Sequence, residues 1–310
     1  MQEFLSLFNI TLFSATLRVS TCLILAGLSY VICAQSGVVD MALEGKLLFG
    51  AFISVFLTQI TGSQIVGLIG AVILTGVYGY LLGLVMVKLH ANQTIVGIGS
   101  NFPMRGITAV LLVIVWNNAG TSDNVGKLAS PITDLLKELP FIGKLFNRQS
   151  AVMLLAYILV IAVSVFLYKT RAGMRLRAIG ENPAAADSLG LNVHRYRLLA
   201  CTVGGMLCGL GGADLSLGQL GYFAKEMTDG RGYIALACAI VGRFTPSRML
   251  ITALLVGLVD ALQVRLQTVY GLSPEFFQII PYLVPIIVIS CFGGIKAPSG
   301  TGKPYRRGER

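Results

Sequence analysis

The side chains of this 310-residue chain that could do chemistry are mostly acids and amides, and they stand among long runs of apolar residues. No GxSxG, HExxH or GxxxxGK[ST] motif occurs, and "SGTGKP" at 299–304 lacks a glycine at the spacing that a phosphate loop needs. The two histidines, His90 and His194, lie far apart in the sequence. We therefore expect no metal site in this chain and no enzyme activity of its own.

The six cysteines lie almost entirely in apolar runs and show no CxxC spacing. They are Cys22, Cys33, Cys201, Cys208, Cys238 and Cys291. Free cysteines usually behave as small buried hydrophobes, so we expect them to pack in the core rather than to bind a metal.

Hydrogen-bonding side chains cluster in the stretch "ANQTIVGIGSNF" at 91–102. The candidates are Asn92, Gln93, Ser100, Asn101 and Phe102. Amides and an aromatic face among apolar walls suit a path for a polar solute, and Asn101 is the strongest single candidate. The alternative is that these amides bridge neighbouring helices, a frequent use of polar residues in membranes.

The elements that must position these residues are membrane helices. The chain is 55% hydrophobic and 12% charged, with a mean hydropathy of +0.77, which lies outside the balance of soluble domains. About 20 apolar residues span a hydrocarbon core, so we expect an all-α polytopic membrane protein with about nine crossings, eight and ten remaining open. The ranges are 10–34, 46–61, 64–87, 95–116, 151–168, 197–216, 231–242, 249–268 and 276–292.

Glycine and proline interrupt many of these ranges, which indicates helices packed tightly against one another rather than single anchors in lipid. The GxxxG pairs Gly79/Gly83 and Gly205/Gly209 fit that interpretation. The first range carries Arg18 and lacks the basic start of a signal peptide, so we expect a retained helix.

The placement of charge predicts orientation. Lysine and arginine crowd the connection at 169–197 and the tail at 293–310, so both should face the cytoplasm. The connection at 117–150 balances basic with acidic side chains and should lie outside. We expect one transmembrane domain over 1–292, with its N-terminus outside if there are nine crossings. The net charge of +10 then sets orientation rather than nucleic-acid binding.

The two halves of the chain come into register at the offset that separates Glu44 from Asp229, 229 − 44 = 185 residues. At this offset "EGK" at 44–46 falls on "DGR" at 229–231, and three predicted crossings of the first half fall on later ones. Five crossings separate the partners, an odd number, which predicts an inverted repeat, a common plan of transporters. The polar, glycine-broken stretches 37–46 and 226–232, with Glu44 and Asp229, would then line a solute path; ordinary interfacial turns are the alternative.

Four charged residues fall inside apolar stretches: Arg18, Arg105, Asp260 and Arg265. An exposed charge there would cost several kcal/mol, so each must face a partner, a cavity or the interface. For Asp260 two alternatives are equally good: an ion pair that only holds helices together, or a role in transport.

The segment "GENPAAADSLGLN" at 180–192 predicts a short capped helix on the cytoplasmic side. Asn182 suits the N-cap, Pro183 the first helical position, and Gly190 the stop. A helix of about two turns is marginal alone because isolated helices under about 12 residues are barely stable in water. Its alanine face favours docking into a groove of another protein over resting on lipid.

The longer stretch "AGMRLRAIGENPAAADSLGLNVHRYR" resembles the cytoplasmic coupling segment of permease subunits from ABC importers of the ribose, simple-sugar and branched-chain amino-acid group. "GRGYIALACAIVGRFTP" at 230–246, "ALEGKLLFGAF" at 42–52 and "ANQTIVGIGSNF" resemble the nucleoside subgroup most closely. The likeness spans 37–292. Phe102 departs from it, because the subgroup more often has leucine there.

The resemblance implies an ATP-driven importer in the bacterial cytoplasmic membrane, with this chain forming half of the path for nucleosides. Implied partners are a second, different permease, an extracytoplasmic solute-binding protein, and a cytoplasmic ABC ATPase that holds ATP and magnesium; this chain would hold no cofactor. Coupling to the ATPase would fall on Gly180, Glu181, Asn182, Pro183, Ala184, Ala185, Ala186 and Asp187. The path would be lined by Glu44, Asn92, Gln93, Asn101, Phe102 and Asp229.

Two alternatives remain open. Ribose or another simple sugar is the alternative cargo within the resemblance. An ion-coupled secondary transporter would share the inverted repeat, but it should carry ion sites in its broken helices and would not need the capped cytoplasmic helix. A channel would need a filter-like stretch, and the sequence offers none.

Overall fold

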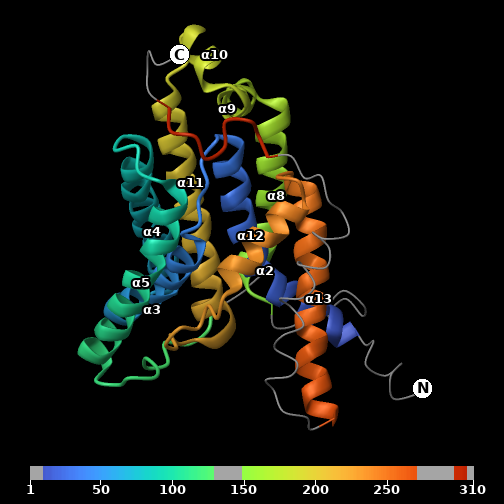
Figure 1. The fold of residues 1–310 in the computed structure, drawn as a ribbon. Coiled ribbons are helices and arrows are strands. Elements are labelled where there is room, and N and C mark those ends of the chain that lie inside the picture. Colours follow the sequence, from blue (N-terminus) through green and yellow to red (C-terminus); the bar gives the residue numbers. More distant parts are fainter. Residues whose placement is uncertain (1–9, 129–148, 271–296, 306–310) are drawn as a thin grey trace.

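The computed structural model describes residues 10–128, 149–270 and 297–305, and they fold almost entirely into helices (Figure 1). Seven helices of this described part are long and apolar enough to cross a membrane. The elements are α2 (Ile10–Gln35), α3 (Leu43–Thr61), α4 (Gln64–Val87), α5 (Gln93–Trp116), α8 (Ala151–Lys169), α9 (Arg171–Glu181), α10 (Pro183–Ser188), α11 (Val193–Ala213), the π-helical η1 (Asp214–Leu220), α12 (Arg231–Val241) and α13 (Pro246–Tyr270).

Eight of the nine predicted crossings fall on observed helices, and the all-helical class is confirmed. The ninth, 276–292, lies outside the described residues, and α12 is apolar but shorter than a crossing. The count of nine therefore stays a prediction. Helix α3 begins three residues before its predicted start because Glu44 and Lys46, which hydropathy alone excludes from a crossing, are buried in its first turns.

The turns predicted to be cytoplasmic gather at one end of the bundle. Gln35 Nε2, at the end of α2, donates a 2.8 Å hydrogen bond to the carbonyl of Phe244, which follows α12. Helices α9 and α10 lie at this end together with residues 297–305, drawn in red in Figure 1. Part of the connection predicted to be outside lies at the other end, where Ser122 N donates to the carbonyl of Phe223. The predicted sidedness of these turns is internally consistent.

Helices α2 and α11 form the centre of the molecule, and most of each is buried. They run antiparallel, since a side chain on Gly204 would meet Cys33 and one on Gly211 would meet Leu25. Helices α4 and α5 lie outside this centre and expose most of their apolar residues. The described cysteines are all buried in or beside this centre, as predicted; Cys291 lies outside the described residues.

Helices α4 and α11 meet along a seam of glycines. A Cβ on Gly79 would lie 3.0 Å from the Cα of Gly205, and a Cβ on Gly205 would lie 3.1 Å from the Cα atoms of Gly76 and Gly79. The GxxxG pairs noted in the sequence therefore mark a close helix contact. Backbones this near leave no room for a methyl group.

We predict that Gly205→Ala destabilises the protein by about 1–3 kcal/mol through overpacking. The loss should appear although alanine favours helix over glycine by about 1 kcal/mol. Thermal melting in detergent measures it. Gly106→Ala on α5 is the matched control, because nothing lies within 4 Å of its Cβ position. A Gly205→Ala protein that melts at or above the wild-type temperature would contradict the tight seam.

Candidate functional site

The N-terminal ends of α3 and α12 meet inside the bundle, and Glu44 joins them. Its carboxylate accepts hydrogen bonds from Thr228 Oγ1 (2.6 Å), Gly230 N (2.9 Å) and Gly232 N (2.8 Å). The side chain is only 1% exposed. A carboxylate is favoured there because unpaired N–H groups and the helix dipole make the start of a helix positive. Glu44 of α3 thus caps α12.

A buried ion pair involves Lys46, two residues after Glu44 in α3. Lys46 Nζ is 2.5 Å from Asp40 Oδ2, and both side chains are 1% exposed. Cys33 Sγ contacts the same carboxylate oxygen at 3.6 Å. Both residues lie in the candidate stretch 37–46, but the sequence did not predict that they form an ion pair. Removing one partner of such a pair leaves an uncompensated buried charge.

Asn101 fastens α5 to this junction. Its Nδ2 donates to the carbonyl of Met41 and to the hydroxyl of Tyr233, both at 3.0 Å, and its Oδ1 accepts from Gly45 N at 2.8 Å. The side chain is buried and reaches two other segments, the start of α3 and the first turn of α12. These contacts fit the alternative in which the amide bridges helices, and they place Asn101 between both helix ends.

Gln93 lies at the start of α5 and also reaches the chain before α3. Its Oε1 accepts a 2.7 Å hydrogen bond from Val39 N. Its buried Nε2 has no hydrogen-bond partner among the described residues. A buried donor without a partner is costly, so this amide group could serve a polar solute.

The other predicted path residues are exposed. Asn92 is an exposed N-cap whose Oδ1 accepts from Thr94 N and Ile95 N. Phe102 points away from the bundle and is 66% exposed. Asp229 is exposed at a strained, positive-φ position next to the junction. No contact in the structure assigns a solute to any of them, and their role stays a prediction.

Two of the intramembrane charges have partners. Arg105 Nη2 lies 3.9 Å from Glu44 Oε1, so it adds a positive charge at the junction from α5. Arg265 Nη2 donates to Thr11 Oγ1 and ties α13 to α2. Sequence reasoning missed Asp214, a buried acid in η1 that accepts from Ser150 Oγ and Gln219 Nε2. The polar residues just before α8 and after α11 were the available signal.

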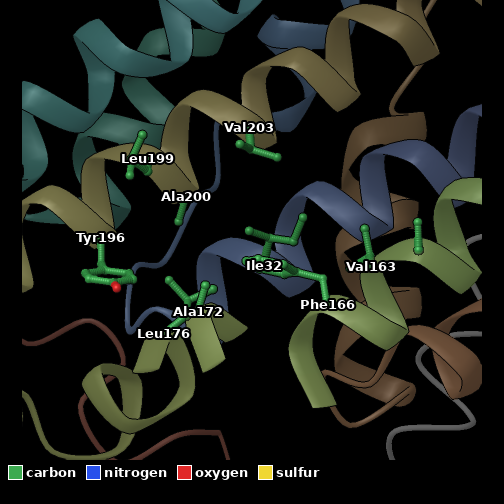
Figure 2. A pocket seen from close by; sticks show the side chains of 10 residues that line it. Ile32, Val163, Phe166, Ala172, Leu176, Tyr196, Leu199, Ala200 and Val203 are labelled. Atoms are coloured by element: carbon green, nitrogen blue, oxygen red, sulfur yellow. The ribbon is translucent and has the colours of Figure 1, made fainter. Parts of the chain in front are cut away.

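A separate cavity of about 460 Å³ lies between α2, α8, α9 and α11 (Figure 2). Residues such as Phe166, Leu199 and Val203 line it, and the hydroxyl of Tyr196 is the polar group that it offers. A hydroxylated solute needs several polar partners in its site. We therefore place no polar site there.

The predicted capped helix is present as α10 and follows α9 without a loop. Asn182 Oδ1 accepts from Ala185 N at 3.0 Å, Pro183 takes the first helical position, and Gly190 follows with a positive φ of 83°. Ala186 is buried against α9 and α11 with Ile179 and Val193. The local capping chemistry of the sequence is confirmed.

The outward face of α10 is small and open. Ala184 and Ala185 are exposed, and Leu189 just after the helix is 82% exposed. An alanine face flanked by one open leucine suits a shallow protein groove, since it can be buried with little loss of side-chain freedom. The neighbours Gly180 and Glu181 instead face residues 299–300 of the chain, to which they are hydrogen-bonded. Asp187 is half-buried.

Comparisons with known proteins agree with this architecture. The family described as "Branched-chain amino acid transport system / permease component" matches residues 12–289. The chain is 33% identical to the nucleoside ABC transporter permease protein NupC of Lactococcus lactis, covering 92% of this chain and 93% of the relative. It is 32% identical to a putative glucose ABC transporter permease, TsgC13, of Haloferax volcanii, covering 90% of both.

A guanosine ABC transporter permease, NupQ of Bacillus subtilis, is 29% identical over 96% of both chains. No solved structure matches. The relatives cover nearly the whole chain, so the match includes the junction at Glu44 and the segment around α10.

Proposed function

Because this chain belongs to the family of branched-chain amino acid transport system permease components, we propose that it forms half of the membrane path of an ATP-driven nucleoside importer. The family makes the chain a multi-pass membrane subunit of an ABC transporter. The nucleoside cargo rests on one observation above others: relatives named for nucleoside and guanosine transport match more than nine-tenths of the chain.

The junction of α3 and α12 is the proposed solute path. Glu44 and Arg105 bring opposite charges there, and Gln93 Nε2 and Asn101 bring amides. A base and a ribose could hydrogen-bond with such groups. Affinity held in the permease slows release, so we expect a weak site. Asn92, Phe102 and Asp229 belong to the proposal as residues beside this path.

The inverted repeat is part of the proposal, and the packing supports it. Helix α4 packs on α11 as its proposed partner α13 packs on α2, and α3 packs on α11 as α12 packs on α2. The proposed partners α2 and α11 run antiparallel, and α3 and α12 meet at their N-terminal ends. An inverted repeat requires all of these relations.

A cytoplasmic ABC ATPase is the proposed partner of α10, and it would hold the ATP and magnesium. A second, different permease is the other proposed partner. Relatives occur as two unequal matches in one organism: NupC at 33% and NupB at 23% in Lactococcus lactis. An extracytoplasmic binding protein would deliver solute to the opposite face.

Uptake by the purified complex in proteoliposomes tests the cargo. We expect ATP-dependent accumulation of labelled guanosine or uridine that unlabelled nucleosides compete away and glucose does not. A putative glucose permease among the relatives makes sugar the second candidate, so labelled glucose and ribose are run in parallel. Accumulation of a sugar without any nucleoside would move the assignment to sugar import. Accumulation driven by an ion gradient without ATP would overturn the importer.

A further inference from the structure

Residues 297–305 cross the cytoplasmic end of the bundle and touch three elements that are far apart in the sequence. Gly300 N donates to the carbonyl of Gly180 at 2.9 Å, just before α10. Gly302 N donates to the carbonyl of Gly37 at 3.2 Å, in the loop between α2 and α3. The carbonyl of Tyr305 lies 3.1 Å from His90 Nε2, between α4 and α5. We name residues 297–305 the tail strap.

Arg197 of α11 is hydrogen-bonded to the tail strap. Its guanidinium donates to the carbonyls of Ser36 (Nε, 3.2 Å), Lys303 (Nη1, 3.1 Å) and Gly300 (Nη2, 3.5 Å). The side chain is 1% exposed and pairs with no carboxylate in the part of the chain that the structure describes. A buried guanidinium needs its donors satisfied, so the three carbonyls fix the strap and the loop to each other.

Four segments converge at this point with no space between them. A Cβ on Gly37 would lie 2.9 Å from Arg197 Nη2 and 3.3 Å from both the Cα of Gly180 and the carbonyl oxygen of Gly300. A Cβ on Gly180 would collide with the carbonyl of Gln35 at the end of α2. Close packing makes such a contact transmit displacement instead of absorbing it.

The strap also contacts the segment that leads into α10. Ser299 N and Ser299 Oγ each donate a 3.2 Å hydrogen bond to Glu181 Oε2. Tyr305 packs with the small apolar cluster around Ala186, and its ring centroid lies 6.0 Å from that of His194. The strap is therefore hydrogen-bonded to the end of α9, just before α10, packs on the cluster that contains Ala186 of α10, and is hydrogen-bonded to the α2–α3 loop at Gly37.

We infer that the tail strap carries the movement of α10 to the loop between α2 and α3, and that Arg197 is the positioning residue that fastens it. The loop leads directly to Glu44 at the start of α3. A pull on Gly37 therefore acts on the junction that we propose as the solute path. This inference rests on the proposed function of α10 as the contact with an ATPase.

The test measures the ratio of solute taken up to ATP hydrolysed by equal amounts of purified complex. Gly300→Val should lower this ratio about tenfold, a coupling loss of the usual size between sites. Its side chain would push against the carbonyl of Gly180, 2.7 Å from the Cβ position, and against Pro183 Cδ at 3.0 Å. ATP hydrolysis and the amount of bound ATPase should stay at wild-type values.

Arg197→Gln is the second variant and should lower the same ratio, because fewer donors remain for the three carbonyls. Thr301→Val is the matched control, since the buried hydroxyl of Thr301 has no partner among the described residues. A wild-type ratio in Gly300→Val would overturn the inference. If the purified wild-type complex contains no ATPase, the proposed coupling function fails, and the inference about the strap fails with it. This outcome is known before any variant is compared.

A disulfide gives an independent readout. Glu181→Cys with Ser299→Cys joins the strap to the last residue of α9, just before α10, where both native side chains are exposed and hydrogen-bonded to each other. Because Glu181 is also an expected ATPase-coupling residue, the oxidised double variant is compared only with its own reduced form. The strap and α10 should move together, so uptake per ATP should be the same in both forms. A loss of uptake on oxidation that a reductant restores would show that the two must separate, which contradicts the inference.

Discussion

Ala185→Trp should lower ATP-dependent uptake about a hundredfold, since truncated or blocked hot-spot contacts cost a few kcal/mol at protein interfaces. Ala185 is exposed on α10, and its own N–H is already bound to Asn182 Oδ1. An indole on this face therefore changes the surface offered to the partner without changing the cap. The ATPase should no longer copurify with the variant.

The fold of Ala185→Trp should survive, because surface substitutions usually change stability by less than about 0.5 kcal/mol. Melting in detergent checks this. Ala185→Ser is the control, as it keeps a small side chain at the same place and should retain uptake. Normal copurification of the ATPase with the tryptophan variant would remove α10 from the proposed interface.

Glu44→Ala should remove both folding stability and transport. Thr228 Oγ1, Gly230 N and Gly232 N would lose their shared acceptor in a buried site. Leaving such donors unsatisfied costs about 1–3 kcal/mol each, and losing one member of a buried charged set costs about 3–5 kcal/mol. Little folded protein should be recovered from membranes.

The variant Glu44→Gln distinguishes an effect on solute transport from an effect on folding. The amide keeps the volume and one acceptor oxygen, but its NH₂ group would face a backbone donor, and Arg105 would lose its negative neighbour. We expect folded complex that binds the ATPase and takes up solute at about one-tenth of the wild-type rate, a loss of about 1.4 kcal/mol. Glu226→Gln, which changes an exposed acid in the turn before α12, should behave as wild type. Unimpaired uptake by Glu44→Gln would exclude Glu44 from the path.

Local chemistry made several of these features predictable. Asn182, Pro183 and Gly190 are each typical of one position at a helix end, so α10 was predictable from neighbouring residues alone. The apolar ranges predicted the long helices because burial and lipid both favour uninterrupted hydrophobic segments. The alignment of "EGK" with "DGR" singled out Glu44, whose buried position at the start of α12 then came from the structure.

Contacts between distant segments were beyond such reasoning. In the sequence, Arg197 is one of many positive charges that predict the orientation of the chain. The charge pattern does not show which of these side chains is buried. The three acceptors of Arg197 are backbone carbonyls, which no residue type reveals. The basic tail likewise predicts only orientation from its charge. The part of the tail that contacts the bundle is a run of small residues near Gly300. Asp40 and Lys46 lie in the candidate stretch 37–46, but their pairing was not predictable because each alone resembles an interfacial residue.

The exposed position of α5 has an evolutionary consequence. Its outer face takes little part in the central packing, and nothing lies within 4 Å of the Cβ positions of Gly99 and Gly106. Substitutions there should hardly change folding free energy, yet they sit on the helix that carries Asn101 and Arg105. Mutational tolerance and the proposed solute path thus coincide on one helix. A lineage could then exchange one cargo for another without rebuilding its energy-coupling machinery.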